Sequence, residues 1–158
     1  MTMGLVQTLE RIETKLVGYT VTASLNQDLE AGIIGGLRNQ LVDRRHEIAN
    51  QSDDAGIYLV QVYQDCEWTP DVPFVSVVAV EVSDFTHIPE GFVTHTIPAG
   101  SYVKVTHIGP ESQIGKTYDS IRDQGIDGAR PFDFEYWGSI DTLEQEESAI
   151  DIYLPIEA

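Results

Sequence analysis

One order of elements occurs twice in this chain and constrains its fold more than any other feature. Each copy reads strand, helix, strand, strand, over residues of approximately 10–84 and 91–157. The copies also open alike, because Gly18-Tyr19 in the first corresponds to Gly100 and Tyr102 in the second, with one residue inserted. We therefore expect a single α+β domain over residues 1–158. Duplicated β-α-β-β units would form its antiparallel sheet, with two helices on one face and a cleft between the halves.

Two segments carry the apolar spacing of an amphipathic helix. The first has Asn26 or Asp28 placed to cap its start, and the second begins after Gly109-Pro110 and ends at Gly125. The apolar positions are Leu29, Ile33, Leu37, Leu41 and Ile48 in the first and Ile114, Tyr118 and Ile121 in the second. Three glycines within residues 32–36 weaken the first helix and predict close packing against another backbone.

Segments rich in β-branched and aromatic residues predict the strands, because these side chains suit a pleated surface. They span residues 15–24, 56–63, 73–82, 92–107, 132–137 and 149–155. The fourth is broken at Pro98-Ala99-Gly100. The acidic stretch 139–148, which joins the last two strands, is expected to be a solvated loop.

The charge balance is strongly acidic, with 26 Asp and Glu against 9 Lys and Arg and a net charge of −17. Lys and Arg are the residues that bind phosphate backbones, so we expect no direct binding of nucleic acid. The acidity fits solubility, attraction of cationic ligands or adaptation to high salt. No stretch approaches the roughly 20 apolar residues that span a bilayer, and the first 20 residues lack a signal core. We expect a cytoplasmic protein that does not act at a membrane.

No pattern predicts a metal, a cofactor or a nucleophilic enzyme. The four histidines, His46, His87, His95 and His107, lack metal-ligand spacing. The single cysteine, Cys66, has no basic neighbours that would lower its pKa and no partner for a disulfide. Nucleophile elbows, phosphate-binding loops and dinucleotide fingerprints are missing. A binding protein is therefore favoured over an enzyme.

The segment 132–137 carries the candidate site. Alternate side chains of a strand share a face, so Asp133, Glu135 and Trp137 point one way and the three other aromatic side chains the other. If the first face meets the helices, a carboxylate lies beside an indole in an apolar cleft. If the second face does, three aromatic rings build the core. A buried carboxylate flanked by rings would suit an organic cation, through charge and cation–π attraction.

Four short motifs, in this order, resemble the GyrI-like family of small-molecule-binding domains. They are Ile97 to Tyr102, Gly109-Pro110, Phe132 to Tyr136 and Ile152 to Ile156. Such domains bind effectors in AraC-type and MerR-type multidrug-responsive regulators and also occur as free-standing proteins. The resemblance implies the duplicated fold, a ligand cleft between the halves and a match of Glu135 to the acid that faces cationic aromatic ligands. No residues remain for a helix-turn-helix, so a regulatory role is expected through a partner or by sequestering the ligand.

We therefore predict that the chain binds hydrophobic, cationic aromatic small molecules. The predicted ligand-binding residues are Glu135, Trp137, Tyr58, Tyr102, Trp68 and Tyr153. Two alternatives stay open. With a raised pKa, Glu135 could activate water against an electrophilic ligand, which would make the protein a hydrolase. The acidic surface could instead dock a protein partner, either a DNA-binding regulator or, as for some free-standing members of the family, DNA gyrase.

Overall fold

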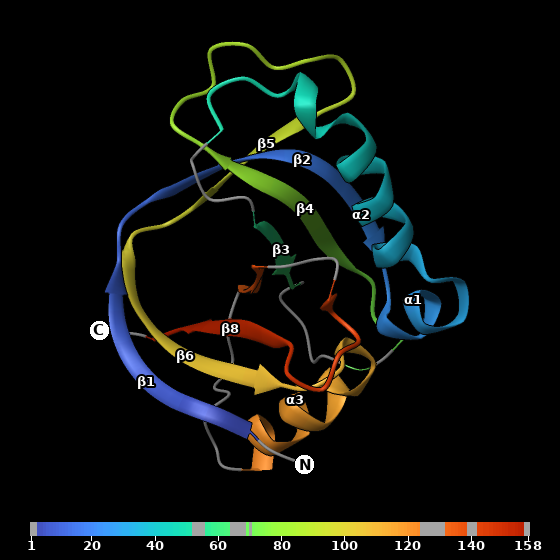
Figure 1. The fold of residues 1–158 in the computed structure, drawn as a ribbon, viewed down its shortest axis with the longest axis vertical. Coiled ribbons are helices and arrows are strands. Elements are labelled where there is room, and N and C mark those ends of the chain that lie inside the picture. Colours follow the sequence, from blue (N-terminus) through green and yellow to red (C-terminus); the bar gives the residue numbers. More distant parts are fainter. Residues whose placement is uncertain are drawn as a thin grey trace.

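The computed structural model describes residues 3–51, 56–63, 69, 71–123, 132–138 and 142–156. They form an eight-stranded antiparallel sheet, strongly curled, with helices packed against it (Figure 1). The strands are β1 (Met3–Arg11), β2 (Thr14–Ala23), β3 (Ile57–Val62), β4 (Phe74–Val82), β5 (Val93–Ile97), β6 (Gly100–Ile108), β7 (Phe132–Trp137) and β8 (Ala149–Pro155). The helices are α1 (Leu25–Ala31), α2 (Ile33–Arg44) and α3 (Ile114–Asp123), with 3₁₀ turns η1 (Arg45–Glu47) and η2 (Glu111–Gln113). The predicted α+β class is confirmed.

The order of the strands is symmetric. Across the sheet it reads β1-β6-β8-β7-β3-β4-β2-β5. The strands correspond in pairs: β1 to β5, β2 to β6, β3 to β7 and β4 to β8. When the two members of every pair are exchanged, the result is the same order read from the other edge of the sheet. The two halves are therefore related by a pseudo-twofold axis between β3 and β7, where Leu59 lies opposite Glu135. The duplication expected from the order of elements is present in the sheet itself.

Each half begins with one strand more than the predicted unit. β1 was not predicted at all, and β5 is the first part of a segment predicted as one interrupted strand. Both strands pair with the opposite half: β1 with β6, and β5 with β2. Such strands gain their stability from pairing with residues far along the chain, so a local pattern shows them poorly.

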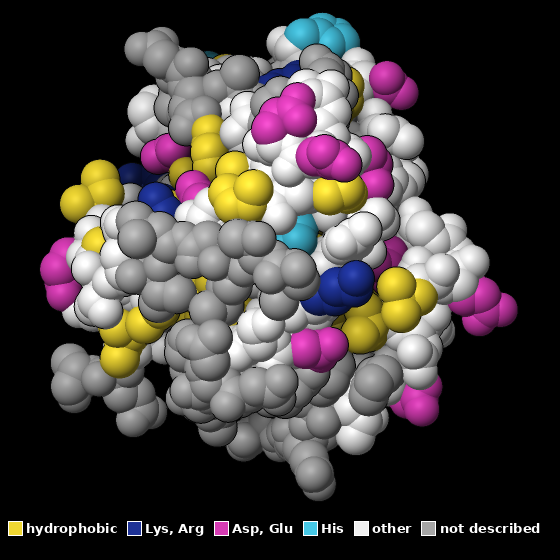
Figure 2. All heavy atoms as spheres, turned by 60° about the horizontal axis from the view of Figure 1, so that its bottom comes forward, with side chains coloured by type: hydrophobic (Ala, Val, Ile, Leu, Met, Phe, Trp, Pro, Cys, Tyr) yellow, Lys and Arg dark blue, Asp and Glu magenta, His cyan; other side chains and the backbone are white. Residues whose placement is uncertain are grey.

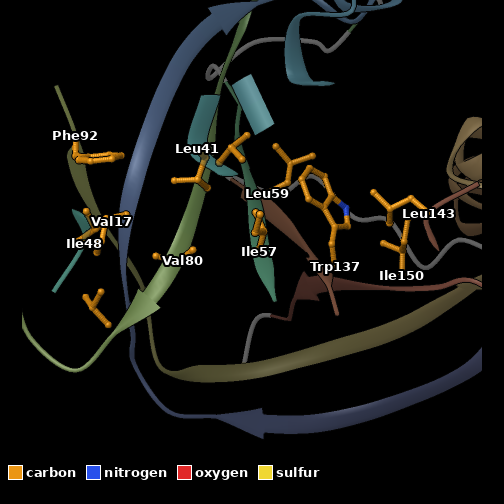
Figure 3. Close-up of a cluster of buried hydrophobic side chains, with 12 residues drawn as sticks. Val17, Leu41, Ile48, Ile57, Leu59, Val80, Phe92, Trp137, Leu143 and Ile150 are labelled. Carbon is orange, nitrogen blue, oxygen red and sulfur yellow. The ribbon is translucent and has the colours of Figure 1, made fainter. Parts of the chain in front are cut away.

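Both faces of the sheet are buried. The helix face, against which α2 and α3 pack, includes Val17, Leu59, Val80, Val105, Trp137, Ile150 and Ile152, and Figure 3 shows part of it. The opposite face, here called the aromatic face, includes Leu16, Tyr58, Val60, Tyr102, Phe134 and Tyr153. The prediction that the helices share one face of the sheet is confirmed, as Ile34, Leu37, Leu41, Ile114 and Ile121 all contact the helix face.

The first predicted helix is in fact two. Gly32 adopts the left-handed conformation, with φ of 63°, and so ends α1 and starts α2. The break leaves Leu29 72% exposed, although its spacing had placed it with the core. The close backbone packing predicted from the glycines is wrong, because a Cβ on Gly35 or Gly36 would meet no atom within 4 Å. A close approach occurs instead at Gly18, whose Cβ would collide with the carbonyl oxygen of Val78 on β4.

The caps of these helices also differ from the prediction. Ser24 caps α1 through a capping box with Gln27, whose amide donates 3.2 Å to the serine hydroxyl. Asp28 caps the next helix instead, since it accepts a 2.7 Å hydrogen bond from the amide of Ile34. Asn26 bonds to the side chain of Asp71. The last described residue of α3 is Asp123, so the predicted end at Gly125 lies outside the described residues.

Acidic side chains are spread over the face shown in Figure 2 and do not gather into one patch. The exposed large apolar side chains are likewise scattered: Ile12, Leu29, Val42, Ile108 and Ile156. Within the described ranges, no helix has both the length and the apolar character needed to cross a membrane.

Candidate functional site

The strand β7 presents its carboxylates to the helix face. Its register places Glu135 between Leu59 of β3 and Ile152 of β8, both buried on that face. The first of the two alternatives for this strand is therefore correct. The rings on the other side also build a core, because Phe134 is fully buried on the aromatic face. The strand serves both purposes because the sheet is covered on both sides.

The carboxyl group of Glu135 is buried and accepts two hydrogen bonds from neutral aromatic donors. The Tyr118 hydroxyl donates to Oε2 at 2.6 Å, and the Trp137 indole Nε1 donates to Oε1 at 3.0 Å. Only 4% of Glu135 is exposed. Among the residues that the structure describes, no Lys or Arg forms an ion pair with this group. Within that part of the chain, its charge, when present, is therefore balanced by the dipoles of these two donors.

This environment raises the pKa of Glu135 from its ordinary value of 4.5 to about 7. Loss of hydration on burial is the main cause. The hydrogen bonds from Tyr118 and Trp137 lower the pKa and so limit the rise, while the nearby charges of Asp133 and Glu111 add to it. The carboxyl group can therefore gain or lose its proton near neutral pH, which is unusual for a glutamate and common in functional sites.

Tyr118 reaches Glu135 because α3 is held over the second half of the sheet. Ile121 on the same side of the helix is 1% exposed and packs with Val105 and Ile152. Burial raises the pKa of Tyr118 well above its ordinary value, so the hydroxyl keeps its proton and remains a donor. A tyrosine on the apolar side of a helix needs a hydrogen-bond partner for its hydroxyl. This requirement is the feature of the sequence that could have identified Tyr118 as a partner of a buried polar group.

A buried histidine fixes the start of α3. His107 Nε2 lies 2.9 Å from the Pro110 carbonyl oxygen, and Nδ1 lies 2.6 Å from the Thr117 hydroxyl. Because a carbonyl oxygen only accepts, Nε2 is the donor, and in a neutral ring Nδ1 accepts from Thr117. His107 is 2% exposed. It is a buried residue of strand β6.

Trp137 links the carboxyl group to α2. The indole is 1% exposed and lies in the core cluster with Leu59 and Leu143 (Figure 3). The guanidinium carbon of Arg38 lies 4.7 Å from the centroid of its ring. Arg38 also pairs with Glu111, at 2.7 Å and 3.1 Å. Nothing in the sequence pattern indicated Arg38, because an arginine on an amphipathic helix is usually a solvated residue.

The structure brings together Glu135 and Trp137 but not the other predicted ligand-binding residues. Tyr58, Tyr102 and Tyr153 lie on the aromatic face, so the sheet separates them from Glu135. There they cluster near Arg11, whose guanidinium carbon is 4.7 Å from the ring of Tyr153. Trp68 lies outside the described residues. Side-chain spacing could not assign these tyrosines to a face without the register of the sheet.

Other kinds of site find little support in the described part of the chain. Within it, no three His, Cys, Asp or Glu side chains are grouped to hold a metal ion. A surface hollow is lined by Glu47, Thr86, His87, Ile88 and Pro89, and Tyr118 and Trp137, the hydrogen-bond partners of Glu135, are not among them. Glu135 is 4% exposed and Trp137 is 1% exposed, so the Glu135 site is closed to solvent in this structure.

Comparison with known proteins finds similarity in sequence and in fold. The transcriptional regulator BrlR of Pseudomonas aeruginosa is 31% identical over 158 residues, which cover 94% of this chain and 54% of the regulator. The chain thus spans about half the length of that relative. An integron cassette protein from the mobile metagenome of Vibrio cholerae superimposes with a TM-score of 0.72 at 15% identity, over 98% of this chain and 97% of the other.

A further solved structure, SAV2435 bound to tetraphenylphosphonium, matches with a TM-score of 0.73 at 18% identity, over 98% of this chain and 95% of the other. At such identities the structural likeness shows a shared fold. The family model described as an integron-associated effector binding protein matches residues 9–156. The predicted GyrI-like effector-binding domain is confirmed, and the chain belongs to the Cass2 family of integron-associated effector binding proteins.

Proposed function

We propose that this chain binds hydrophobic organic cations with aromatic substituents, and that the Glu135 carboxylate receives their positive charge. One observation carries the proposal: a buried glutamate is held between two neutral aromatic donors, with no ion pair to a described Lys or Arg. An ionised carboxylate in such a place is costly unless a positive charge approaches it. A cationic ligand relieves that cost, so binding and ionisation are coupled.

The surroundings of Glu135 favour a bulky, delocalised cation over a small inorganic one. A small ion would lose its hydration in an apolar site, and no cluster of oxygen ligands among the described residues would replace it. The rings of Trp137 and Tyr118 would add cation–π attraction of roughly 0.5–2 kcal/mol each. Support for this ligand class comes from SAV2435, which shares the fold and was solved with tetraphenylphosphonium.

Access to Glu135 requires a local movement, because Tyr118 already occupies Oε2. The contacts that would have to loosen are those of α3, namely Ile121 against β6 and β8, and Thr117 against His107. A bulky ligand would replace part of this buried apolar surface with its own. We therefore infer that ligand binding shifts α3, so that the surface around α3 differs between the free and the bound protein.

A regulatory output would follow from that difference. BrlR, of which this chain spans about half the length, is a transcriptional regulator, so the altered surface around α3 would act on transcription. Sequestering the ligand is the simpler role and needs no partner. A partner bound mainly through the dispersed acidic surface would be released by moderate salt, because exposed charge pairs are screened.

Isothermal titration calorimetry with tetraphenylphosphonium tests the proposal. We expect wild type to bind it and Glu135→Gln to bind at least tenfold more weakly. Glu146→Gln is the matched control, because it removes one negative charge at an exposed position. Neutral triphenylphosphine oxide should bind wild type and Glu135→Gln with similar weak affinity. If the cation binds both proteins equally well, Glu135 does not receive the charge.

The pKa of about 7 also supports a second candidate function, hydrolysis of electrophilic small molecules with Glu135 as general base. A base is most effective when its pKa lies near the working pH. This reading requires water beside Oε1 or Oε2, which Trp137 and Tyr118 now occupy. Turnover of an epoxide or activated ester by wild type, lost in Glu135→Gln, would establish it. Intact substrates after prolonged incubation would exclude it for those compound classes.

A further inference from the structure

The site already contains a cation of its own. The guanidinium carbon of Arg38 lies 4.7 Å from the centroid of the Trp137 ring, and the indole N–H of the same ring donates to Glu135. The Arg38 side chain is only 18% exposed. Its position on the ring is one that an organic cation would take when bound beside this carboxylate.

We propose that Arg38 is an internal competitor that covers Trp137 in the closed state, that a cationic ligand binds by displacing it, and that its ion pair with Glu111 latches the two halves together. Only the displacement of Arg38 by a cationic ligand rests on the proposed function. The latch is a property of the free protein.

The latch connects the elements that must separate for Glu135 to become accessible. Arg38 belongs to α2 in the first half, and Glu111 belongs to η2, which leads directly into α3. Two hydrogen bonds, at 2.7 Å and 3.1 Å, join the guanidinium to both carboxylate oxygens of Glu111. Such a bidentate pair fixes the orientation of both side chains. The start of α3, and with it Tyr118, is thereby tied to α2.

The 3₁₀ turn that carries Glu111 is itself anchored. The backbone amide of Glu111 donates 2.7 Å to the carbonyl oxygen of Leu143. Next to it, the amide and hydroxyl of Ser112 donate to the two carboxylate oxygens of Glu144, at 3.0 Å and 2.8 Å. A displacement of Arg38 is therefore coupled, through Glu111, to the segment 142–148 and to the start of α3. Loss of the Arg38–Glu111 pair removes this polar link to α2, while the apolar contacts of Leu37 with the core cluster that contains Leu143 remain.

Arg44 on the same helix also combines a contact with an aromatic ring and an ion pair with a glutamate, but this ion pair does not reach η2 or α3. Its guanidinium carbon lies 4.7 Å from the centroid of Phe92, and it pairs with Glu47 at 2.8 Å. Both members of that pair belong to the first half, three residues apart. The pair therefore does not tie α2 to η2 or α3. Arg44 and Glu47 provide matched controls for Arg38 and Glu111.

Hydrogen exchange in the absence of ligand tests the latch. In Glu111→Gln, exchange of the backbone amides of residues 114–123 should become about fivefold faster, because α3 opens more often. In Glu47→Gln it should stay as in wild type. Equal exchange of these amides in wild type and Glu111→Gln would overturn the latch, whatever the protein binds.

Calorimetry with tetraphenylphosphonium tests the displacement. Arg38→Met keeps an apolar stem over Trp137 but removes the charge, so it should bind at least fivefold more tightly than wild type. Arg44→Met should agree with wild type within twofold. Thermal unfolding of each variant confirms that it is folded. Equal or weaker binding by Arg38→Met would refute the competitor role, even if wild type binds well. If neither wild type nor Arg38→Met binds the cation, the proposed function fails, and with it the displacement, while the exchange measurement still decides the latch.

Discussion

The hydroxyl of Tyr118 and the carboxylate of Glu135 meet at 2.6 Å, which joins the middle of α3 to the middle of the sheet. This single bond makes the position of the helix sensitive to the charge of the carboxyl group. An ionised carboxylate holds the hydroxyl more strongly than a protonated one. Ionisation near neutral pH, opening of α3 and ligand binding are therefore expected to be linked.

Removal of the tyrosine hydroxyl should change the pKa of Glu135. In Tyr118→Phe, Oε2 loses a donor that stabilises the ionised form, so the pKa should rise further above 7. The free energy of unfolding at pH 8 should fall by about 1–2 kcal/mol, and by less at pH 5, where the carboxyl group is protonated. NMR titration of the glutamate carboxyl carbon measures the pKa, and denaturant unfolding measures the stability. An unchanged pKa would show that Tyr118 contributes nothing to the ionised form.

The pH dependence of stability should carry the signature of Glu135. Its pKa is raised in the folded protein to about 7 from an ordinary value of 4.5. The folded state therefore holds the proton more tightly, so the contribution of Glu135 is fully favourable below pH 4.5 and is lost as pH rises to 7 and above. Relative to Glu135→Gln, wild type should lose about 3 kcal/mol between pH 4 and pH 8.

The difference between the two proteins is the quantity to measure, because the many other carboxylates contribute equally to both. Denaturant unfolding at a series of pH values gives it directly. A difference that stays constant from pH 4 to pH 8 would mean that the pKa of Glu135 is not raised on folding.

Ligand binding should release a proton. A cation favours the ionised carboxylate, so bound ligand should lower the pKa of Glu135 from about 7. The affinity for tetraphenylphosphonium should rise with pH up to about 7 and then level off, with close to a tenfold change per pH unit below pH 6. Calorimetry at pH 6 in buffers of different ionisation enthalpy measures the number of protons released. In Glu135→Gln the release should vanish.

Two glycines should respond to alanine in opposite directions. In Gly18→Ala the new methyl group collides with the backbone of β4 at Val78, so β2 must shift, and we expect a loss of about 1–3 kcal/mol. In Gly36→Ala the methyl group meets open space on α2, and the better helix propensity should stabilise the protein by about 0.5–1 kcal/mol. Thermal and denaturant unfolding measure both. A loss on Gly36→Ala would mean that α2 packs there more closely than the structure indicates.

The sequence predicted what depends on local pattern. The order of elements, the class of fold and the pairing of Glu135 with Trp137 on one side of β7 all follow from a spacing of two or of about four residues. The alternation within β7 also defined two possible faces, of which one had to meet the helices. Only the packing of α3 against residues of β6 and β8 showed which one does, and the pattern within β7 contains no information on that packing.

The features that were missed depend on long-range pairing. β1 is a strand because β6 lies beside it, and Arg38 belongs to the site because Glu111 comes within 2.7 Å, although 73 residues separate them. Tyr58, Tyr102 and Tyr153 were assigned to the pocket because tyrosines often line such sites. Their face was decided by the register of β3, β6 and β8, which the sequence does not display.

The exchange of β1 and β5 between the halves has one more consequence. Since each half supplies an edge strand to the other, neither can complete its own share of the sheet when separated at residues 83–92. The two fragments should instead reassemble when mixed, and a chain of half this length could build the same sheet as a twofold dimer. Fusion of the halves into one polypeptide makes asymmetry possible. On β3 the positions opposite Glu135 and Asp133 are the uncharged Leu59 and Gln61, so the carboxylates of this strand pair belong to the second half alone.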